Sequence, residues 1–334
     1  MTAPGKNSVP ADREHITEHG GMPHSLRTEV LDGLTAVPKT LPPKLFYDAI
    51  GADLFERITT LPEYYLTNAE LEILEARADE IAALAAPRAT LLEYGSGAGI
   101  KVRLLLNAFA AAGISIAAYV PIDISREQLA SVAAQIAAEY PDVPVHLVCA
   151  DYTAPLTLPD LPLRARRVAF FPGSTIGNFH PTEAAAFLHR VRRTVGNDGA
   201  LVLGVDRRKN ASVLNAAYDD AAGVTADFNL NMLHRLNREL GADFDTARFA
   251  HRAFFNETAG RVEMHLVSLD RQVVNVAGAN IEFEQGETIW TESSYKYDRE
   301  ALDLLVSSAG FRVERLWTDS AERFWVTYLT AARA

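Results

Sequence analysis

The sequence has a single cysteine, Cys149, among its 334 residues. One thiol cannot form a disulfide within the chain, and it excludes a cysteine-rich metal site. Basic residues are also few, since 32 Lys and Arg stand against 43 Asp and Glu, giving a formal net charge of −11. Because binding to phosphates needs a basic face, this charge argues against a nucleic-acid partner.

Long apolar runs are missing as well. No uncharged apolar stretch approaches the roughly 20 residues that cross a bilayer, and residues 1–24 lack the basic and apolar segments of a secretory signal. We expect a cytoplasmic protein without membrane contact or an obligate protein partner, and with a flexible tail at residues 1–24. His15, His19 and His24 could be read as metal ligands, but a flexible tail does not hold ligand geometry, so we expect no metal.

Strands and helices are expected to alternate after an aromatic-rich segment at residues 38–65. Thr67 and Glu70 have the spacing of a capping box, which predicts a helix from Thr67 to about Ala85. Strands are expected at 90–94, 116–122, 145–149, 167–171 and 200–205, and helices at 101–112, 126–140 and 181–195. This alternation predicts an α/β fold, with a parallel sheet covered by helices on both faces.

The pattern changes after Asp206. A mostly helical stretch at 209–240 precedes alternating segments at 250–256, 261–269 and 272–277, which predict antiparallel strands. A helix at 297–309 and strands at 312–317 and 323–329 close the chain. We therefore expect one doubly wound domain, formed by 67–206 and 296–334, and a second α+β domain, formed by 25–66 and 207–295.

A glycine-rich turn follows the first of these strands. Gly95, Gly97 and Gly99 come directly after Glu93 and Tyr94, and such small residues let the backbone approach a ligand at the end of a strand. Alone, this turn would suit a dinucleotide, S-adenosylmethionine (SAM) or a tight connection without a ligand.

Two further strand ends sharpen the interpretation. Asp123 ends the second strand, where a ribose diol would lie, and Asp151 and Tyr152 follow the third, where they could hold adenine. Each aspartate alone could instead cap a helix or lie in a solvated turn. Taken together they favour SAM over NAD, because the loop lacks the third glycine of the dinucleotide spacing.

The fourth strand leads into a run that ends at Asn178. An amide can accept a hydrogen bond from an amine and donate one to a carboxylate, so Asn178 is a candidate substrate-binding residue. The alternative is a turn asparagine before the helix that begins at Pro181.

These residues belong to a wider resemblance, which runs from about Arg27 to the C-terminus. The chain resembles the histidine-specific Nα-methyltransferases of ergothioneine biosynthesis in five segments, which are Pro42–Asp48, Leu61–Tyr65, Gly173–Asn178, Ala217–Gly223 and Thr291–Ser294. The resemblance implies a class I (Rossmann-like) SAM-dependent methyltransferase domain with a second, substrate-binding domain. It also implies trimethylation of the α-amino group of L-histidine to hercynine, the first step of ergothioneine biosynthesis.

The resemblance assigns roles to single residues. Tyr64, Asn178 and Tyr218 match positions that hold the carboxylate and amine of the substrate, and Tyr47 matches a tyrosine on the amine side. Glu292 and Ser294 match the pair that holds the imidazole, and Met264 matches a residue of the pocket wall. The expected SAM-binding residues are Gly95, Gly97, Lys101, Asp123, Asp151, Tyr152 and Gly173. The loop Ala98–Ile100 departs from the small hydroxyl residues of relatives, so only backbone contacts are expected there.

The residue types also fit a histidine substrate. Glu292 can accept an imidazole N–H, and a buried carboxylate would be left unpaired by an apolar side chain. The alternative is that Glu292 and Ser294 lie on a solvated strand face. With no obvious general base, we expect the amine proton to leave through Tyr47 and water while Asn178 orients the lone pair. Other open interpretations are the same fold acting on another amino acid such as tryptophan, a silent SAM-binding module, and an NAD(P)-dependent oxidoreductase.

Overall fold

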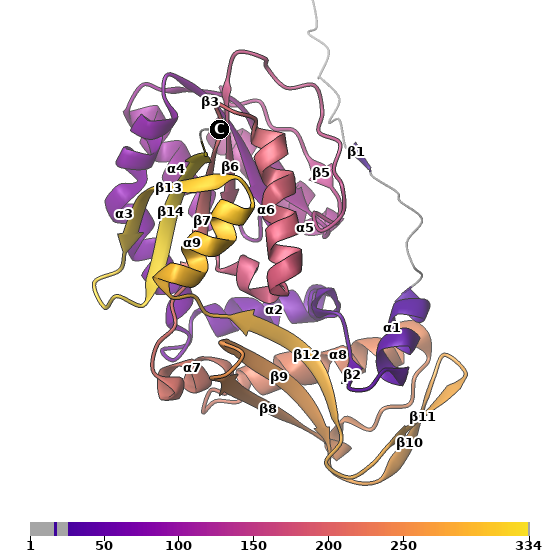
Figure 1. Cartoon of the computed structure of the whole chain (residues 1–334). Coiled ribbons are helices and arrows are strands. Elements are labelled where there is room, and N and C mark those ends of the chain that lie inside the picture. Colours follow the sequence, from indigo (N-terminus) through magenta and orange to yellow (C-terminus); the bar gives the residue numbers. More distant parts are fainter. Residues whose placement is uncertain (1–16, 19–25, 333–334) are drawn as a thin grey trace, which may run out of the picture.

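The computed structural model describes residues 17–18 and 26–332. Most of the predicted tail, including His15, His19 and His24, lies outside these residues. The molecule has an upper part built on a large sheet and a lower part built on two smaller sheets (Figure 1).

The large sheet has the strand order β1-β5-β4-β3-β6-β7-β14-β13. In that order its strands are Thr17–Glu18, Val148–Cys149, Ser115–Asp123, Arg88–Tyr94, Arg166–Phe171, Ala200–Asp206, Phe324–Ala331 and Phe311–Thr318. The strands from β1 to β7 are parallel, whereas β14 is antiparallel to both of its neighbours. The predicted α/β class with a largely parallel sheet is confirmed.

Helices cover both faces of this sheet. One face carries α3 (Tyr65–Ala85), α4 (Ile100–Ala111) and α5 (Arg126–Glu139), and the other carries α6 (Pro181–Val195) and α9 (Arg299–Ser308). Successive side chains of a strand point to opposite faces. Leu91 and Leu92 of β3 are accordingly both fully buried, but in different apolar clusters.

The predicted capping box at Thr67 and Glu70 is wrong. Helix α3 begins at Tyr65, with Tyr64 at its N-cap, so that both residues lie within the helix. Glu70 is fully buried and accepts hydrogen bonds from the backbone N–H of Gly173 at 2.8 and 3.0 Å. The Glu70 carboxylate therefore binds the distant Gly173 and not, as the spacing had predicted, the N-terminus of its own helix.

The lower part contains a four-stranded sheet with the order β2-β12-β9-β8 and a hairpin of β10 and β11. The strands are β2 (Lys39–Thr40), β8 (Phe249–Asn256), β9 (Arg261–Ser268), β10 (Gln272–Val276), β11 (Ala279–Phe283) and β12 (Thr288–Tyr295). Its helices are α1 (Leu26–Thr35), η1 (Pro43–Phe46), α2 (Ala49–Thr59), α7 (Ala211–Tyr218), α8 (Val224–Leu240) and η3 (Thr246–Arg248), while η2 (Thr175–Asn178) follows β6. The predicted antiparallel strands are present, but β11, β12, α1 and α2 were not anticipated.

The mostly helical stretch predicted at 209–240 is present and consists of two helices, α7 and α8. Asp220 lies between them, and its carboxylate accepts hydrogen bonds from the backbone N–H groups of Val224 (2.9 Å) and Thr225 (2.8 Å). An acidic side chain in this position satisfies the free N–H groups at the start of a helix. Asp220 thereby starts α8 and lets the chain turn after Tyr218.

No helix within residues 26–332 is both long and apolar enough to cross a membrane. The described part of the chain also brings together no group of three or more His, Cys, Asp and Glu side chains able to hold a metal ion.

Candidate active site

The glycine-rich turn after β3 has an open backbone. Gly95, Gly97 and Gly99 have φ values of 73°, 48° and 68°, which favour glycine over other residues. A Cβ atom at Gly95 would lie 3.7 Å from the Tyr152 hydroxyl. The positive φ is thus what favours glycine at this position, and the turn runs directly past the Tyr152 ring.

Polar groups surround this turn. Asp123 Oδ1 accepts a hydrogen bond from the Ser125 N–H (3.0 Å), and Asp151 Oδ1 accepts one from the Thr153 N–H (2.9 Å). Burial raises the pKa of the Asp123 carboxyl. The hydroxyl of Ser96 is buried and has no hydrogen-bond partner within residues 17–18 and 26–332. An unpaired buried hydroxyl beside two carboxylates and an aromatic ring fits a nucleoside such as that of SAM.

Lys101 and Gly173 meet at the carboxyl ends of β3 and β6. Lys101 Nζ forms an ion pair with the buried Glu70, which also binds the Gly173 N–H. A Cβ atom at Gly204 would lie 2.1 Å from Glu70 Oε1, so only glycine leaves room for this carboxylate. The arrangement holds Lys101 beside the loop after β6.

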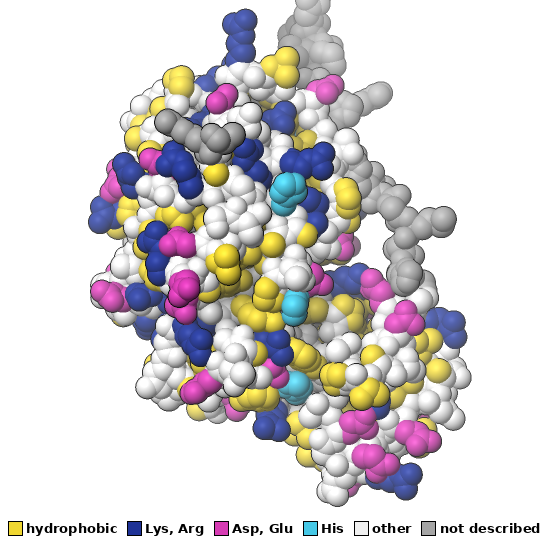
Figure 2. Space-filling view, in the orientation of Figure 1, with side chains coloured by type: hydrophobic (Ala, Val, Ile, Leu, Met, Phe, Trp, Pro, Cys, Tyr) yellow, Lys and Arg dark blue, Asp and Glu magenta, His cyan; other side chains and the backbone are white. Residues whose placement is uncertain are grey.

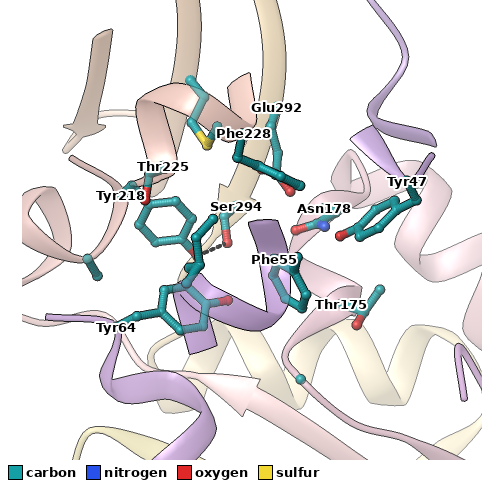
Figure 3. Close-up of a pocket in the computed structure, with 14 residues that line it drawn as sticks. Tyr47, Phe55, Tyr64, Thr175, Asn178, Tyr218, Thr225, Phe228, Glu292 and Ser294 are labelled. Atoms are coloured by element: carbon teal, nitrogen blue, oxygen red, sulfur yellow. Dashed lines mark hydrogen bonds between the residues drawn. The ribbon is translucent and has the colours of Figure 1, made fainter. Parts of the chain in front are cut away.

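A cavity lies between this edge of the large sheet and the lower part (Figure 3). It is lined by Tyr47, Phe55, Ile58, Tyr64, Gly173, Thr175, Asn178, Ala217, Tyr218, Thr225, Phe228, Met264, Glu292 and Ser294. All seven residues that the sequence assigned to the substrate line it, together with Gly173 from the expected SAM site. In Figure 2, hydrophobic side chains gather at mid-height around a hollow where the upper part meets the lower part.

The walls of the cavity are aromatic. Ring centroids lie 5.9 Å apart for Tyr47 and Phe55, 6.2 Å for Phe55 and Tyr64, and 6.1 Å for Tyr64 and Tyr218. The ring centroid of Phe228 lies 6.1 Å from that of Tyr47 and 6.0 Å from that of Phe55. Neither phenylalanine was predicted from the sequence. The three-residue spacing of Phe55 and Ile58 places these two on one helix face and could have indicated that α2 contributes a wall.

Asn178 lies where the two parts of the molecule touch. It ends the short helix η2, and a Cβ atom at the preceding Gly177 would lie 2.7 Å from the Tyr295 carbonyl oxygen of β12. This close approach brings Asn178 to the strand that carries Glu292. In Figure 3, the amide of Asn178 and the hydroxyl of Tyr47 point into the same part of the cavity.

Glu292 is the acidic group of the cavity. Its side chain is half-buried, and burial raises its pKa to about 7, although the ammonium of Lys296 acts in the opposite direction. Burial also raises the pKa of the Tyr64 and Tyr218 hydroxyls well above 10, so these phenols are neutral hydrogen-bond donors at neutral pH. The cavity thus offers one carboxylate and several hydroxyls.

A buried ion cluster contacts one of these hydroxyls, that of Tyr218, which accepts a hydrogen bond from Lys296 Nζ at 2.8 Å. Asp206 is fully buried between Lys209 and Lys296, and it accepts a hydrogen bond from the Tyr65 hydroxyl at 2.8 Å. Burial alone would raise the pKa of Asp206, but the two lysines hold it below its usual value. This cluster could not be predicted from the sequence, because its members are spread over three separate segments of the chain.

The comparisons with known proteins agree with this geometry. The family described as "Histidine-specific methyltransferase, SAM-dependent" matches residues 26–331. The chain is 45% identical over 302 residues to a histidine N-alpha-methyltransferase from Mycolicibacterium smegmatis, covering 90% of this chain and 93% of the relative. It is 43% identical over 313 residues to a histidine N-alpha-methyltransferase from Mycobacterium tuberculosis, covering 93% and 96%.

A more distant relative is an L-tryptophan methyltransferase from Psilocybe serbica, 28% identical over 344 residues that cover 93% of this chain and 94% of the relative. The family match discards the interpretation as an NAD(P)-dependent oxidoreductase. The chain belongs to the histidine-specific, SAM-dependent methyltransferases.

Proposed function

We propose that this enzyme transfers three methyl groups from SAM to the α-amino group of L-histidine, giving hercynine in the first step of ergothioneine biosynthesis. The observation that carries the proposal is a single aromatic cavity with a carboxylate, Glu292, near the hydroxyls of Tyr218 and Ser294 and the amide of Asn178. These groups complement the ring, carboxylate and amine of free histidine. The two bacterial histidine methyltransferases support the same substrate.

The residues at the end of the large sheet suit SAM, which supplies a sulfonium methyl group when bound. We propose that the backbone of Gly95 and Gly97 lies against it, that Asp123 accepts from the ribose hydroxyls, and that Asp151 and Tyr152 hold the adenine. Lys101 and Gly173 line the edge nearest the cavity, where the ammonium can pair with a carboxylate of the methionine moiety.

The cavity residues orient the amino acid. We propose that the neutral hydroxyls of Tyr64 and Tyr218, together with the Asn178 amide, donate to the α-carboxylate, and that Glu292 and Ser294 hold the ring. Met264, which is buried, packs as part of the wall. Fixing both ends of the substrate leaves its amine facing η2 and the SAM site, so that the lone pair meets the methyl group in line.

The amine must lose one proton for each methyl group that it gains. Desolvation and the nearby Glu292 raise the pKa of the Tyr47 hydroxyl, so this phenol stays neutral. Its oxygen accepts the amine proton while its own hydroxyl proton passes to water, which the partial exposure of Tyr47 allows. The nitrogen–methyl bond forms as the sulfur–methyl bond breaks, and the sulfur keeps the electron pair. As methylation proceeds the nitrogen becomes a permanent cation, which aromatic walls stabilise by about 0.5–2 kcal/mol.

A second candidate substrate is tryptophan, which the Psilocybe relative is named for. Indole has a single N–H, so it would leave either Glu292 or Ser294 without a partner. An unpaired buried polar group costs about 1–3 kcal/mol, which favours histidine.

We also propose that residues 67–206 and 296–334 act as the SAM-binding domain and residues 25–66 and 207–295 as the substrate-binding domain. The small-molecule partner is then L-histidine, and we expect the reaction to take place in the cytoplasm.

The test is mass spectrometry of the purified enzyme incubated with SAM and a panel of free amino acids, including histidine and tryptophan. We expect histidine alone to gain up to three methyl groups. Methylation of another amino acid with histidine unchanged would overturn the substrate and leave the fold and cofactor intact.

A further inference from the structure

Lys296 lies behind the cavity with its side chain fully buried. Its Nζ has three acceptors, which are Asp206 Oδ2, the Tyr218 hydroxyl and the Ser294 hydroxyl, each at 2.8 Å. An ammonium has three N–H donors and no lone pair. Lys296 therefore donates to both hydroxyl oxygens, and neither Tyr218 nor Ser294 can direct its own proton toward it.

Tyr218 and Ser294 also share a hydrogen bond of 2.8 Å, drawn as a dashed line in Figure 3. One of their two hydroxyl protons is used in this bond, so a single proton remains for a ligand. If Tyr218 donates into the cavity, Ser294 donates to Tyr218 and offers the ligand only a lone pair. If Ser294 donates into the cavity, Tyr218 offers only a lone pair.

The carboxylate of the substrate decides between these two arrangements. The proposed function places that carboxylate at Tyr218, and an ionised carboxylate can only accept hydrogen bonds. A charge-assisted hydrogen bond is roughly twice as strong as one to a neutral acceptor. Tyr218 therefore donates to the carboxylate, and Ser294 turns its proton toward Tyr218.

The ring then meets two acceptors, the ionised Glu292 carboxylate and the Ser294 lone pair. We infer that the enzyme binds the histidine ring as an imidazolium, donating one N–H to Glu292 and the other to Ser294, with Lys296 as the positioning residue that fixes this arrangement. The inference rests on the proposed function. It also gives a reason for rejecting indole, which cannot supply a second N–H or a positive charge.

Other charged groups near the ring come from several elements. Glu292 lies on β12 and Lys296 directly follows this strand, Asp206 ends β7, Lys209 follows β7, and the phenols are Tyr47, Tyr64, Tyr65 and Tyr218. Burial raises the pKa of each of these phenols, so they stay neutral. Burial lowers the pKa of Lys209 to about 8, so proton uptake by the whole protein would mix its titration with that of the ring.

The experiment therefore observes the ring directly. Histidine with both ring nitrogens labelled with ¹⁵N is bound to the enzyme with S-adenosylhomocysteine, which has no methyl group to transfer, and its ¹⁵N NMR spectrum is recorded at pH 7.5. The free ring is then about 90% neutral, given an ordinary pKa of about 6.5. We expect two N–H-type nitrogens in the bound ring. A pyridine-type nitrogen would show that Ser294 donates, and would overturn the inference.

Tyr218→Phe gives the sharper result, because it releases the Ser294 proton from its bond to Tyr218. Ser294 can then donate to the ring, so we expect the bound ring to become neutral, with one pyridine-type nitrogen. Tyr140→Phe removes a phenol that bonds to the surface residue Asn107, and this control should keep the imidazolium. An imidazolium that persists in Tyr218→Phe would contradict the role of the Tyr218–Ser294 bond.

Should Tyr218→Phe fail to bind histidine, Ser294→Ala provides the same test. It leaves the Tyr218 proton for the carboxylate and removes one ring acceptor, so the ring should again become neutral. An unchanged imidazolium would overturn the inference.

A methylation assay of the wild-type enzyme distinguishes a failure of the proposed function from a failure of this inference. Unmethylated histidine defeats the proposed function, whereas methylated histidine with a neutral bound ring defeats this inference alone.

Discussion

The SAM end of the large sheet and the substrate cavity are built in different ways. At the SAM end, the two aspartates bond to residues close in sequence, Asp123 to Ser125 and Asp151 to Thr153, although Glu70 adds long-range contacts to Lys101 and Gly173. The cavity instead draws on residues from Tyr47 to Ser294, and its hydroxyls are connected to a buried ion cluster. Consecutive strand ends can thus form much of a cofactor site from local contacts, whereas orienting a small polar substrate requires groups anchored by distant parts of the chain.

Breaking the ion cluster should have the largest effect. Asp206→Asn leaves Lys209 and Lys296 buried without an anion, and removing one partner of a buried ion pair costs about 3–5 kcal/mol. The lowered pKa of Asp206 means that its contribution to stability is present at neutral pH and is lost as the pH falls through that folded-state pKa. Urea unfolding at pH 7 measures this loss.

The matched control is Asp303→Asn, which breaks the exposed pair of Asp303 with Arg299. Exposed pairs of this spacing contribute about 0.3–0.5 kcal/mol. Equal losses of unfolding free energy in the two variants would mean that the buried ion cluster does not stabilise the structure around the cavity.

Asn178→Ala should have the next largest effect, on activity rather than folding. Loss of an orienting amide in an active site lowers turnover by roughly 10²–10³-fold, while the melting temperature should change little because Asn178 is not in the apolar core. Initial rates of methyl transfer and thermal unfolding, compared with the exposed Asn197→Ala, check this expectation. Unchanged turnover would remove Asn178 from the mechanism.

On the SAM side, Glu70→Ala should weaken cofactor binding. The variant leaves the Gly173 N–H unpaired and frees Lys101, and an unsatisfied buried group costs about 1–3 kcal/mol. We expect about tenfold weaker SAM binding by calorimetry. Glu75→Ala, an exposed residue on the same helix, should bind SAM as the wild type does, and equal affinity in both variants would show that Glu70 has no role in holding the cofactor site.

The smallest effect concerns the pH dependence of histidine binding. The ordinary pKa of the imidazole ring is about 6.5, and burial raises the pKa of Glu292 to about 7. An ionised Glu292 and an imidazolium coexist best between these two values, so affinity should be greatest there and should fall at lower pH, where Glu292 is protonated. Glu292→Gln cannot titrate, so its acid limb should be flatter and its affinity at pH 7.5 about tenfold lower, since a charge-assisted bond is replaced. If affinity depended on pH in the same way below pH 7 in the wild type and in Glu292→Gln, the ring would not be bound by Glu292.

The sequence predicted the large sheet well, because parallel strands and covering helices leave strong local patterns. Strand β6 and helix α6, for example, lie within one residue of their predicted bounds. Thr67 and Glu70 show where a local pattern fails. Their spacing fits a capping box, but the Glu70 carboxylate bonds to the distant Gly173 and lies inside the helix.

The cavity could not have been assembled from spacing alone. Glu292 and Ser294 share a strand, but nothing in the sequence brings them to Asn178 or Tyr218, and the resemblance to a family supplied that link. Lys296 and Asp206 were predicted neither from local pattern nor from the resemblance, because a buried ion pair between distant residues leaves no local pattern.

The central claim is that the cavity holds the ring and carboxylate of histidine and leaves the α-amine free to react. It is tested most directly by NMR of the product formed from ¹⁵N-labelled histidine and SAM with a ¹³C-labelled methyl group. The account predicts that all of the transferred methyl carbons couple to the α-nitrogen and none to a ring nitrogen. A methyl group on the imidazole would contradict it, because the ring would then face the SAM site instead of Glu292.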